Sequence, residues 1–401
     1  MTTKNLTSDR INRIKPSPSV AANALVNELR AAGHDIINFT IGEPDFDTPT
    51  HIIEAATQDM HSGDTHYTPS NGTRALREAI TIKLKRDNGL DYSIQEVVCG
   101  NGGKHIISSA FGATLNAGNE VIIHAPYWVS YPDLALLNEA VPVIIAGKEE
   151  LGFKVSPEEI RQAVTNRTKW VILNYPNNPS GVVYNAAELN EIAAVLRDFP
   201  DVLIMLDEIY EHFVYEKSVH ISLAEVAPDL KDRILIINGA LKGYAMTGWR
   251  LGYGVGPEWL ISAMTKLISQ TATCSSSVSQ AGAVVAFAGD QRPVKEMCAV
   301  YETRRRAICD HLCEVEDISF IPPSGAFYLY INVSKLLNKK THNGHILHND
   351  DDVVEYLLRE GGVATVSGKA YGMSPYIRVS FASSLPVIEE GCIRFKTLLA
   401  A

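Results

Sequence analysis

The chain has 401 residues, of which 46% are hydrophobic and 20% are charged, and its formal net charge is −10. This length allows two domains with a large core, and the composition is typical of a globular protein rather than a disordered one. The negative charge argues against nucleic acid as a main partner, and no apolar run approaches the roughly 18 residues of a membrane span. The first residues lack the apolar core of a signal peptide and the six cysteines are scattered, so we expect a cytoplasmic protein with reduced thiols.

Strands and helices are expected to alternate along the first part of the chain, after a polar arm at residues 1–15. The apolar runs predict strands at 36–41, 96–99, 120–123, 140–146, 169–173, 202–206 and 234–237. Helical spacing and capping residues predict helices at 21–32, 50–61, 73–86, from about 104 onward, and at 156–164 and 186–198. This alternation implies an α/β fold with a mostly parallel sheet flanked by helices.

The rest of the chain predicts a second, smaller α+β domain. Helices at 257–270, 275–288 and 295–315 lead to a hairpin at 320–331 and an alternating strand at 377–381. We expect residues 16–49 and 300–401 to form the small domain, 50–299 to form the large one, and the helix at 295–315 to be the hinge. The His- and Asp-rich stretch 342–352 could be read as a metal site, but its acidic residues fit the start of a helix at 353–359, so we expect no metal.

A lysine among small and apolar residues follows the predicted strand at 234–237. Burial of Lys242 would favour its neutral amine, which is a nucleophile that can form a Schiff base with a carbonyl. Arg250 lies further along a glycine-rich segment, and a guanidinium suits bidentate phosphate binding. Taken alone, these two residues favour the simpler interpretation of a surface lysine and an ordinary loop arginine.

An acid and a hydroxyl follow the preceding predicted strand. Asp207 and Tyr210 come after residues 202–206, and ligands of open α/β sheets bind at the carboxyl ends of the strands. A buried acid together with a nearby lysine fits pyridoxal phosphate, which takes a lysine Schiff base and an acidic partner for its ring nitrogen. The glycine-rich turn at 100–104 offers backbone N–H groups to an anion such as a phosphate.

Ten segments carry a family resemblance. In chain order they are KPSPSV, IGEPDFDTP, HYTPSNGTRALREAI, GNGGK, APYWVSYPD, NYPNNPSG, LDEIYEHF, KGYAMTGWRLGY, PSGAFY and YIRVSFA. From about Ile14 to Leu399 the chain resembles a fold-type I, class I aminotransferase of the bacterial aspartate aminotransferase subgroup, which overlaps the prephenate aminotransferases. The resemblance implies pyridoxal phosphate as cofactor and a homodimer with shared active sites.

The resemblance also assigns a role to individual residues. Those toward the cofactor are Lys242 as the Schiff base, Asp207 at the ring nitrogen, Tyr210 and Asn178 at the phenolic oxygen, Trp128 on the ring, and Gly103, Lys104, Arg250 and a neighbouring subunit's Tyr67 at the phosphate. Those toward the substrate are Arg378 at the α-carboxylate, the backbone of Gly42 at the substrate carboxylate, Asn178 and Trp128, and, around the distal carboxylate, Lys104, Ser17, Ser19 and Ser269. Lys242, Asp207 and Tyr210 are the expected catalytic residues. Without the resemblance, Trp128 and Tyr67 would be read as structural aromatics.

These roles imply ping-pong transfer of the amino group of L-aspartate to 2-oxoglutarate, with Lys242 as general base. The same lysine at position 104 makes prephenate a second expected substrate. Two departures from the family pattern leave a specialised biosynthetic aminotransferase open: Leu241 with Gly243 beside the lysine, and Ser367 with Lys369. Gly239 also lacks a hydroxyl, as members of the resembled subgroup do. A lyase, decarboxylase or racemase using the same cofactor, and a non-catalytic relative, are further alternatives, because fold alone does not determine function.

Overall fold

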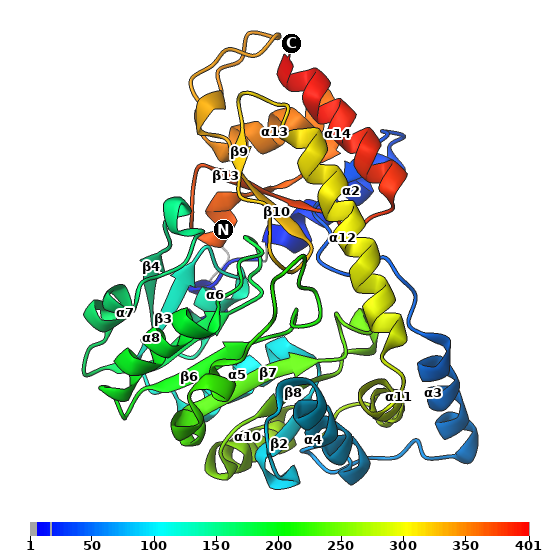
Figure 1. Cartoon of the computed structure of the whole chain (residues 1–401), viewed down its shortest axis with the longest axis vertical. Helices are drawn as coiled ribbons and strands as arrows, with labels where there is room; N and C mark the ends of the chain where they lie inside the picture. Colours follow the sequence, from blue (N-terminus) through cyan, green and yellow to red (C-terminus); the bar gives the residue numbers. More distant parts are fainter. Residues whose placement is uncertain (1–5, 17, 401) are drawn as a thin grey trace.

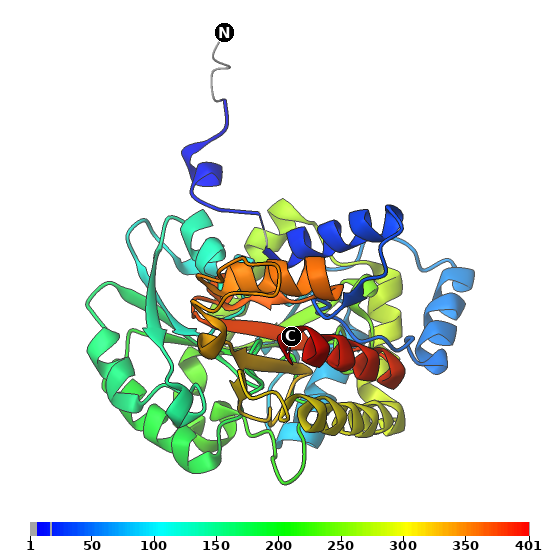
Figure 2. The ribbon, with the colours of Figure 1, turned by 90° about the horizontal axis from the view of Figure 1, so that it is seen from above.

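A seven-stranded, mainly parallel sheet forms the centre of the larger part of the molecule. The computed structural model describes residues 6–16 and 18–400, without the side chains of Ser19 and Ala400 (Figures 1 and 2). In spatial order the strands are β2 (Val97–Gly100), β8 (Gly252–Val255), β7 (Ile234–Gly239), β6 (Leu203–Asp207), β5 (Thr168–Asn174), β3 (Glu120–Ala125) and β4 (Val141–Ala146). Only β8 runs antiparallel to its neighbours within this sheet. The predicted α/β architecture is thereby confirmed.

Alternate residues of each central strand face opposite layers of helices. In β6, Leu203 and Met205 pack with α5 (Gly103–Thr114), α6 (Ser130–Leu137) and α10 (Glu258–Thr271). Ile204 and Leu206 pack into the core shared with α4 (Arg74–Asn88), α8 (Ala186–Arg197) and α11 (Ser277–Ala288). Burial on both faces explains why these strands are continuous apolar runs in the sequence.

The sequence did not reveal β8, because it is short and interrupted by glycines. A Cβ at Gly252 would lie 2.5 Å from the backbone of Gly102, so this strand must pass directly beneath the turn that opens α5. The glycine that weakens the strand pattern is therefore the feature that allows the close approach.

The smaller part contains two further sheets and the longest helix (Figure 1, top). One sheet pairs β1 (Ile37–Asn38) in parallel with β11 (Val363–Ala364), and the other is antiparallel. The antiparallel strands are, in spatial order, β12 (Val366–Ser367), β13 (Tyr376–Ser380), β10 (Tyr328–Asn332) and β9 (Ser319–Phe320). The helices around them are α2 (Pro18–Ala31), α12 (Arg292–Leu312), α13 (Asp350–Gly361) and α14 (Leu385–Ala400). The β1–β11 pairing supports grouping residues 16–49 with 300–401, although the exact domain boundaries stay a prediction.

The remaining α-helices of the described residues are α1 (Asp9–Asn12), α3 (Thr50–Ser62), α7 (Pro157–Ala163) and α9 (Leu223–Val226). The acidic stretch that could have been a metal site forms the first turn of α13, where Asn349 accepts a hydrogen bond from the Asp352 amide at 3.1 Å. Within the described ranges, no helix is both long enough and apolar enough to cross a membrane.

Candidate active site

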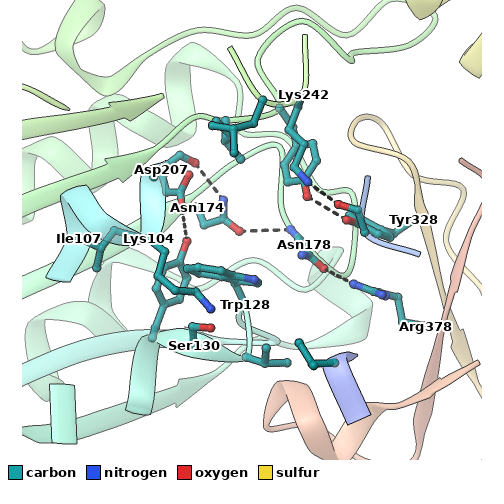
Figure 3. Close-up of a pocket in the computed structure, with 18 of the residues that line it drawn as sticks. Lys104, Ile107, Trp128, Ser130, Asn174, Asn178, Asp207, Lys242, Tyr328 and Arg378 are labelled. Carbon is teal, nitrogen blue, oxygen red and sulfur yellow. Dashed lines mark hydrogen bonds between the residues drawn. The ribbon is translucent and has the colours of Figure 1, made fainter. Parts of the chain in front are cut away.

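A cavity of about 410 Å³ opens where β5, β6 and β7 end. Figure 3 shows its side chains converging from the large sheet and from the smaller part of the molecule. Ten of the residues predicted from the sequence line it: Gly42, Gly103, Lys104, Trp128, Asn178, Asp207, Tyr210, Lys242, Arg250 and Arg378. Residues far apart in the sequence thus contribute to one site.

Asp207 is the last residue of β6 and is buried. Its Oδ2 accepts a hydrogen bond from the Tyr131 hydroxyl at 2.5 Å, and its carbonyl accepts one from Asn174 Nδ2 at 2.9 Å. Asn174 stands directly opposite Asp207 in the β5–β6 register. Burial raises the pKa of Asp207 to about 6, against the lowering effect of the Tyr131 hydrogen bond. A cation bound beside this carboxyl would therefore offset a substantial desolvation cost.

Lys242 lies in the loop after β7, with its ammonium group inside the cavity. Its Nζ donates to the carbonyl of Gly42 and lies 5.7 Å from the centre of the Tyr210 ring. Burial lowers the pKa of Lys242 to about 8, and the positive charges of Arg378 and Arg250 act in the same direction. A neutral, nucleophilic amine is thus accessible close to neutral pH.

An anion site lies at the start of α5. The N-cap of this helix is Gly102, which has no side chain to occupy the first amides, and its φ is +91°. A Cβ on Gly102 would lie 2.6 Å from the Arg250 guanidinium, which donates to the carbonyls of Asn101 at 3.3 Å and Thr247 at 3.0 Å. Lys104 lies in the first turn, and burial with the nearby Arg250 lowers its pKa. Free helix amides and two cations form a cradle suited to phosphate.

Arg378 projects from β13 into the other side of the cavity. Its Nη1 donates to Asn178 Oδ1 at 3.1 Å and its Nη2 to the Thr40 carbonyl at 2.6 Å. Its Nε has no hydrogen-bond partner among the described residues. The guanidinium also lies 4.4 Å from the centre of the Tyr328 ring, whose hydroxyl is 2.8 Å from that of Tyr210. This buried cation is suited to binding a carboxylate.

Trp128 forms a wall of the cavity between these groups. The Lys104 ammonium lies 5.0 Å from its ring centre, and the ring meets Tyr131 edge-on at 5.3 Å. An aromatic wall in this place can support a flat ring whose nitrogen faces Asp207.

The donor set fits pyridoxal phosphate. The cradle at Gly103 and Arg250 matches a phosphate group, the carboxyl of Asp207 matches a protonated ring nitrogen, and Lys242 supplies an amine for the aldehyde. The costly burial of an acid and a lysine in one cavity is what such a cofactor would relieve.

Among the described side chains, two predicted residues, Tyr67 and Ser269, do not line this cavity. Tyr67 has a relative exposure of 89%, so its expected contact with a neighbouring subunit's cofactor stays a prediction. Ser269 lies on the exposed face of α10 and donates to the Lys266 carbonyl at 2.7 Å, because the buried face of that helix consists of apolar residues. The structure therefore does not bring Ser269 to the substrate region of this chain. Ser17 lies outside the described residues, as does the side chain of Ser19.

Sequence reasoning missed the residues that support the predicted ones. Tyr131, Asn174 and Tyr328 all line the cavity and bond to Asp207 or Tyr210, yet none received a role. Their signal was present, because each lies within a segment that carries the resemblance. The remaining missed lining residues are Val20, Ile107, Val129, Ser130 and Ile209, whereas Leu241 was noted from the sequence as a departure from the family pattern.

The departures beside the lysine are matched by neighbouring residues. A Cβ at Gly239 would lie 2.8 Å from Cδ1 of Leu241, so the leucine fills space that a side chain at 239 would need. A Cβ at Gly243 would lie 2.4 Å from Cδ2 of His212, so the glycine makes room for the imidazole ring. Leu241 and Gly243 are therefore parts of a consistent packing arrangement.

Comparison with known proteins agrees with this geometry. A family model described as aminotransferase class I and II matches residues 34–395. The probable aspartate/prephenate aminotransferase of Rickettsia bellii is 46% identical over 392 residues, covering 98% of both chains. The aspartate aminotransferase of Geobacillus stearothermophilus is 42% identical over 392 residues, again 98% of both.

Solved structures are similar along nearly the whole chain. The aspartate aminotransferase of Rhizobium meliloti has a TM-score of 0.96 at 39% identity, covering 99% of both chains. That of Thermus thermophilus with maleate has a TM-score of 0.92 at 37% identity, covering 98% of this chain and all of the other. The likeness therefore extends over both parts of the molecule.

Proposed function

The chain belongs to the class I and II aminotransferase family, and we propose that it transfers the amino group of L-aspartate to 2-oxoglutarate, giving oxaloacetate and L-glutamate. The observation that carries this proposal is one cavity that holds Lys242 and Asp207 together with two separate cations, Arg378 and Lys104. The cofactor is pyridoxal phosphate, which this family of enzymes uses. When bound, it supplies an aldehyde for amines and an electron-withdrawing ring.

Lys242 and Asp207 divide the proton chemistry. With pyridoxal phosphate bound, the Asp207 carboxylate would hold a proton on the ring nitrogen, and the carboxylate is itself oriented by the Tyr131 hydroxyl at 2.5 Å. Lys242 would hold the cofactor through its Nζ, and the same Nζ, once free, would take the substrate Cα proton. A pKa of about 8 leaves part of the Lys242 population neutral near pH 7. Tyr210, whose hydroxyl is fixed by Tyr328, is positioned to donate to the cofactor.

Arg378 and Lys104 explain the choice of a dicarboxylate. Arg378 retains an unpaired Nε donor and is held by Asn178 and the Thr40 carbonyl, which suits it to the α-carboxylate. Lys104 lies against Trp128 and is a further cation that lines the cavity. The similar Thermus thermophilus enzyme is solved with maleate, which is also a dicarboxylate.

Prephenate is a second candidate substrate. Similar proteins from Rickettsia bellii and Cereibacter sphaeroides are named aspartate/prephenate aminotransferases. Prephenate carries a 2-oxo acid group and a distant second carboxylate, so Arg378 and Lys104 would engage it as they engage 2-oxoglutarate. One cavity thus supports both reactions.

The proposed working form is a cytoplasmic homodimer. In this form Tyr67 of each subunit would reach the phosphate end of its partner's cavity. The relative exposure of 89% leaves the Tyr67 ring accessible to a partner subunit, as this role requires.

The experiment is an absorbance spectrum of the purified protein with pyridoxal phosphate, recorded before and after addition of L-aspartate. We expect the band of lysine-bound cofactor to give way to that of the pyridoxamine form, and 2-oxoglutarate or prephenate to restore it. The Lys242→Ala variant, as control, should show neither change. A wild-type band that is insensitive to L-aspartate but responds to another amino acid would contradict the aspartate assignment.

A further inference from the structure

A buried ionic cluster lies behind the active site and outside its cavity. It consists of Glu211 after β6, Asn238 at the end of β7, and Lys83 with Asn88 at the end of α4. The relative exposure is only 1% for Lys83 and 6% for Glu211. None of the four side chains except Asn88 lines any of the described cavities, and Asn88 faces a different one. A buried charge pair of this kind is costly unless its hydrogen bonds are complete.

The Glu211 carboxylate has a partner on each oxygen. Its Oε1 accepts from Asn238 Nδ2 at 2.6 Å and forms an ion pair with Lys83, and its Oε2 accepts from Asn88 Nδ2 at 3.2 Å. Lys83 in turn donates to Asn88 Oδ1 at 2.9 Å. Burial alone would raise the pKa of Glu211, but Lys83 and two nearby histidines hold it well below its ordinary value. The carboxylate is therefore ionised and fixed in orientation.

This carboxylate connects the two segments that carry the proposed catalytic residues. Glu211 follows Tyr210 directly and stands four residues after Asp207, whereas Asn238 stands four residues before Lys242. Asn238 Oδ1 also accepts from the backbone amide of the next residue at 2.8 Å, so the Asn238 side chain ties Glu211 to the start of the lysine loop. The Glu211–Asn238 bond thus adds a side-chain link, beyond the β6–β7 backbone ladder, between the two segments.

Gly243, the residue after Lys242, packs against His212, which in turn lies beside Glu211. His212 Nε2 lies 3.6 Å from Glu211 Oε1, and its ring meets Tyr244 edge-on at 5.7 Å. The ring fills the place of a Cβ at Gly243, which would lie only 2.4 Å from His212 Cδ2. The backbone of Lys242 is accordingly constrained on both sides by groups that contact Glu211.

We propose that Glu211, with its charge balanced by Lys83, is a positioning residue that sets the Lys242 segment relative to the Asp207 segment through Asn238 and His212. This inference rests on the proposed function, because it takes Lys242 as the site of cofactor attachment. It assigns no chemistry to Glu211 itself. The buried pair is retained because the amine must stand at a defined place relative to the acid.

Two variants and a matched control test the proposal. Glu211→Gln removes the charge but keeps the size, and Asn238→Ala removes the link while leaving the Lys83–Glu211 pair in place. The control is Glu120→Gln, because Glu120 is also a buried acid, accepting from Thr165 Oγ1 at 2.5 Å and pairing with Arg167 at 2.5 Å. Glu120 is the first residue of β3, at the end of the sheet opposite the cavity.

Two readouts distinguish a positioning role of Glu211 from a purely stabilising one: the affinity for pyridoxal phosphate and the pH profile of its attachment to Lys242. Both site variants are expected to bind pyridoxal phosphate about 10-fold to 100-fold more weakly, the scale of loss when an oriented group is displaced by about 1 Å. They should also need a higher pH for half-maximal attachment, because a loosened Lys242 becomes better hydrated. The Glu120→Gln control should have a lower melting temperature, but its affinity for pyridoxal phosphate and its pH profile of attachment should equal those of the wild type.

The outcomes distinguish the two proposals. If Glu211→Gln and Asn238→Ala lower the melting temperature as the control does but keep both cofactor readouts, the cluster is only structural and the inference is wrong. A wild type that forms no lysine-bound cofactor would instead overturn the proposed function, and this inference with it.

Discussion

Replacing Asp207 with asparagine separates the cost of burying its carboxyl from its role toward the cofactor. The substitution keeps the size of the side chain and an oxygen that can accept from the Tyr131 hydroxyl, which is 2.5 Å away in the wild type. It removes the negative charge that burial disfavours. The apoprotein should therefore become more stable, whereas the enzyme with cofactor should lose its partner for the ring nitrogen.

The magnitude follows from the pKa of Asp207, which is about 6 in the folded chain and ordinarily 3.8. Because the folded value is the higher one, the folded state binds more protons between these values, and stability falls as pH rises through this window. The cost is about 3 kcal/mol at pH 7.5 and about half of that at pH 5. With an unfolding entropy near 2.1 cal/mol/K per residue, the variant should melt roughly 3 to 4 °C higher at pH 7.5.

The assay is thermal unfolding of wild type and Asp207→Asn at both pH values, with and without pyridoxal phosphate. Without cofactor, the variant should melt higher, and by a larger margin at the higher pH. With cofactor, the order should reverse. Asp350→Asn serves as control, since Asp350 is buried and its Oδ2 accepts three hydrogen bonds, from Ser367, Ser374 and the Lys369 amide. Removing its charge weakens these three bonds and should only destabilise the protein. An apoprotein variant no more stable than wild type at either pH would refute the reasoning.

Other substitutions test the substrate contacts and the packing of the lysine loop. Arg378→Lys keeps the charge but loses the planar fork, so kcat/KM should fall about 100-fold for every amino acid tested. Lys104→Met should lower kcat/KM about 10-fold to 100-fold for L-aspartate and much less for an apolar amino acid, because only the dicarboxylate loses a charged contact. Gly243→Ala should destabilise the protein by about 1 to 3 kcal/mol through overlap with His212, and adding His212→Ala should restore most of that stability, as measured by denaturant unfolding.

Each of these expectations has a contrary result. Equal losses for both classes of amino acid in Lys104→Met would mean that this lysine serves the phosphate cradle alone. Retention of wild-type kcat/KM by Arg378→Lys would remove the bidentate assignment. A Gly243→Ala protein as stable as the wild type would show that the His212 ring can move away at little cost.

The sequence predicted the elements that are long or strongly apolar. The run at 202–206 and the one at 234–237 correspond to β6 (Leu203–Asp207) and β7 (Ile234–Gly239), because strands buried on both faces leave a continuous hydrophobic signal. The strand expected at 36–41 is shorter, Ile37–Asn38, and pairs with a strand more than 300 residues away, a contact that local periodicity does not report.

At the candidate site, the residues proposed to act on the cofactor could be predicted from the sequence, whereas the residues that hydrogen-bond to them could not. Lys242 and Asp207 could be singled out because each follows a predicted apolar strand and lies in a segment that carries the family resemblance. Tyr131 reaches Asp207 from α6 and Tyr328 reaches Tyr210 from β10, and both depend on how distant elements pack. Leu241 could be noted as a departure from the sequence alone, but its contact with the position of a Gly239 side chain required the structure.

The most direct test of the central claim is to incubate the protein with pyridoxal phosphate, reduce it with borohydride, and locate the added mass by peptide mapping. The structure predicts a single stoichiometric modification on Lys242, which prior addition of L-aspartate should largely prevent. Modification of Lys104 instead, or labelling spread over surface lysines and unaffected by L-aspartate, would contradict the account of this cavity.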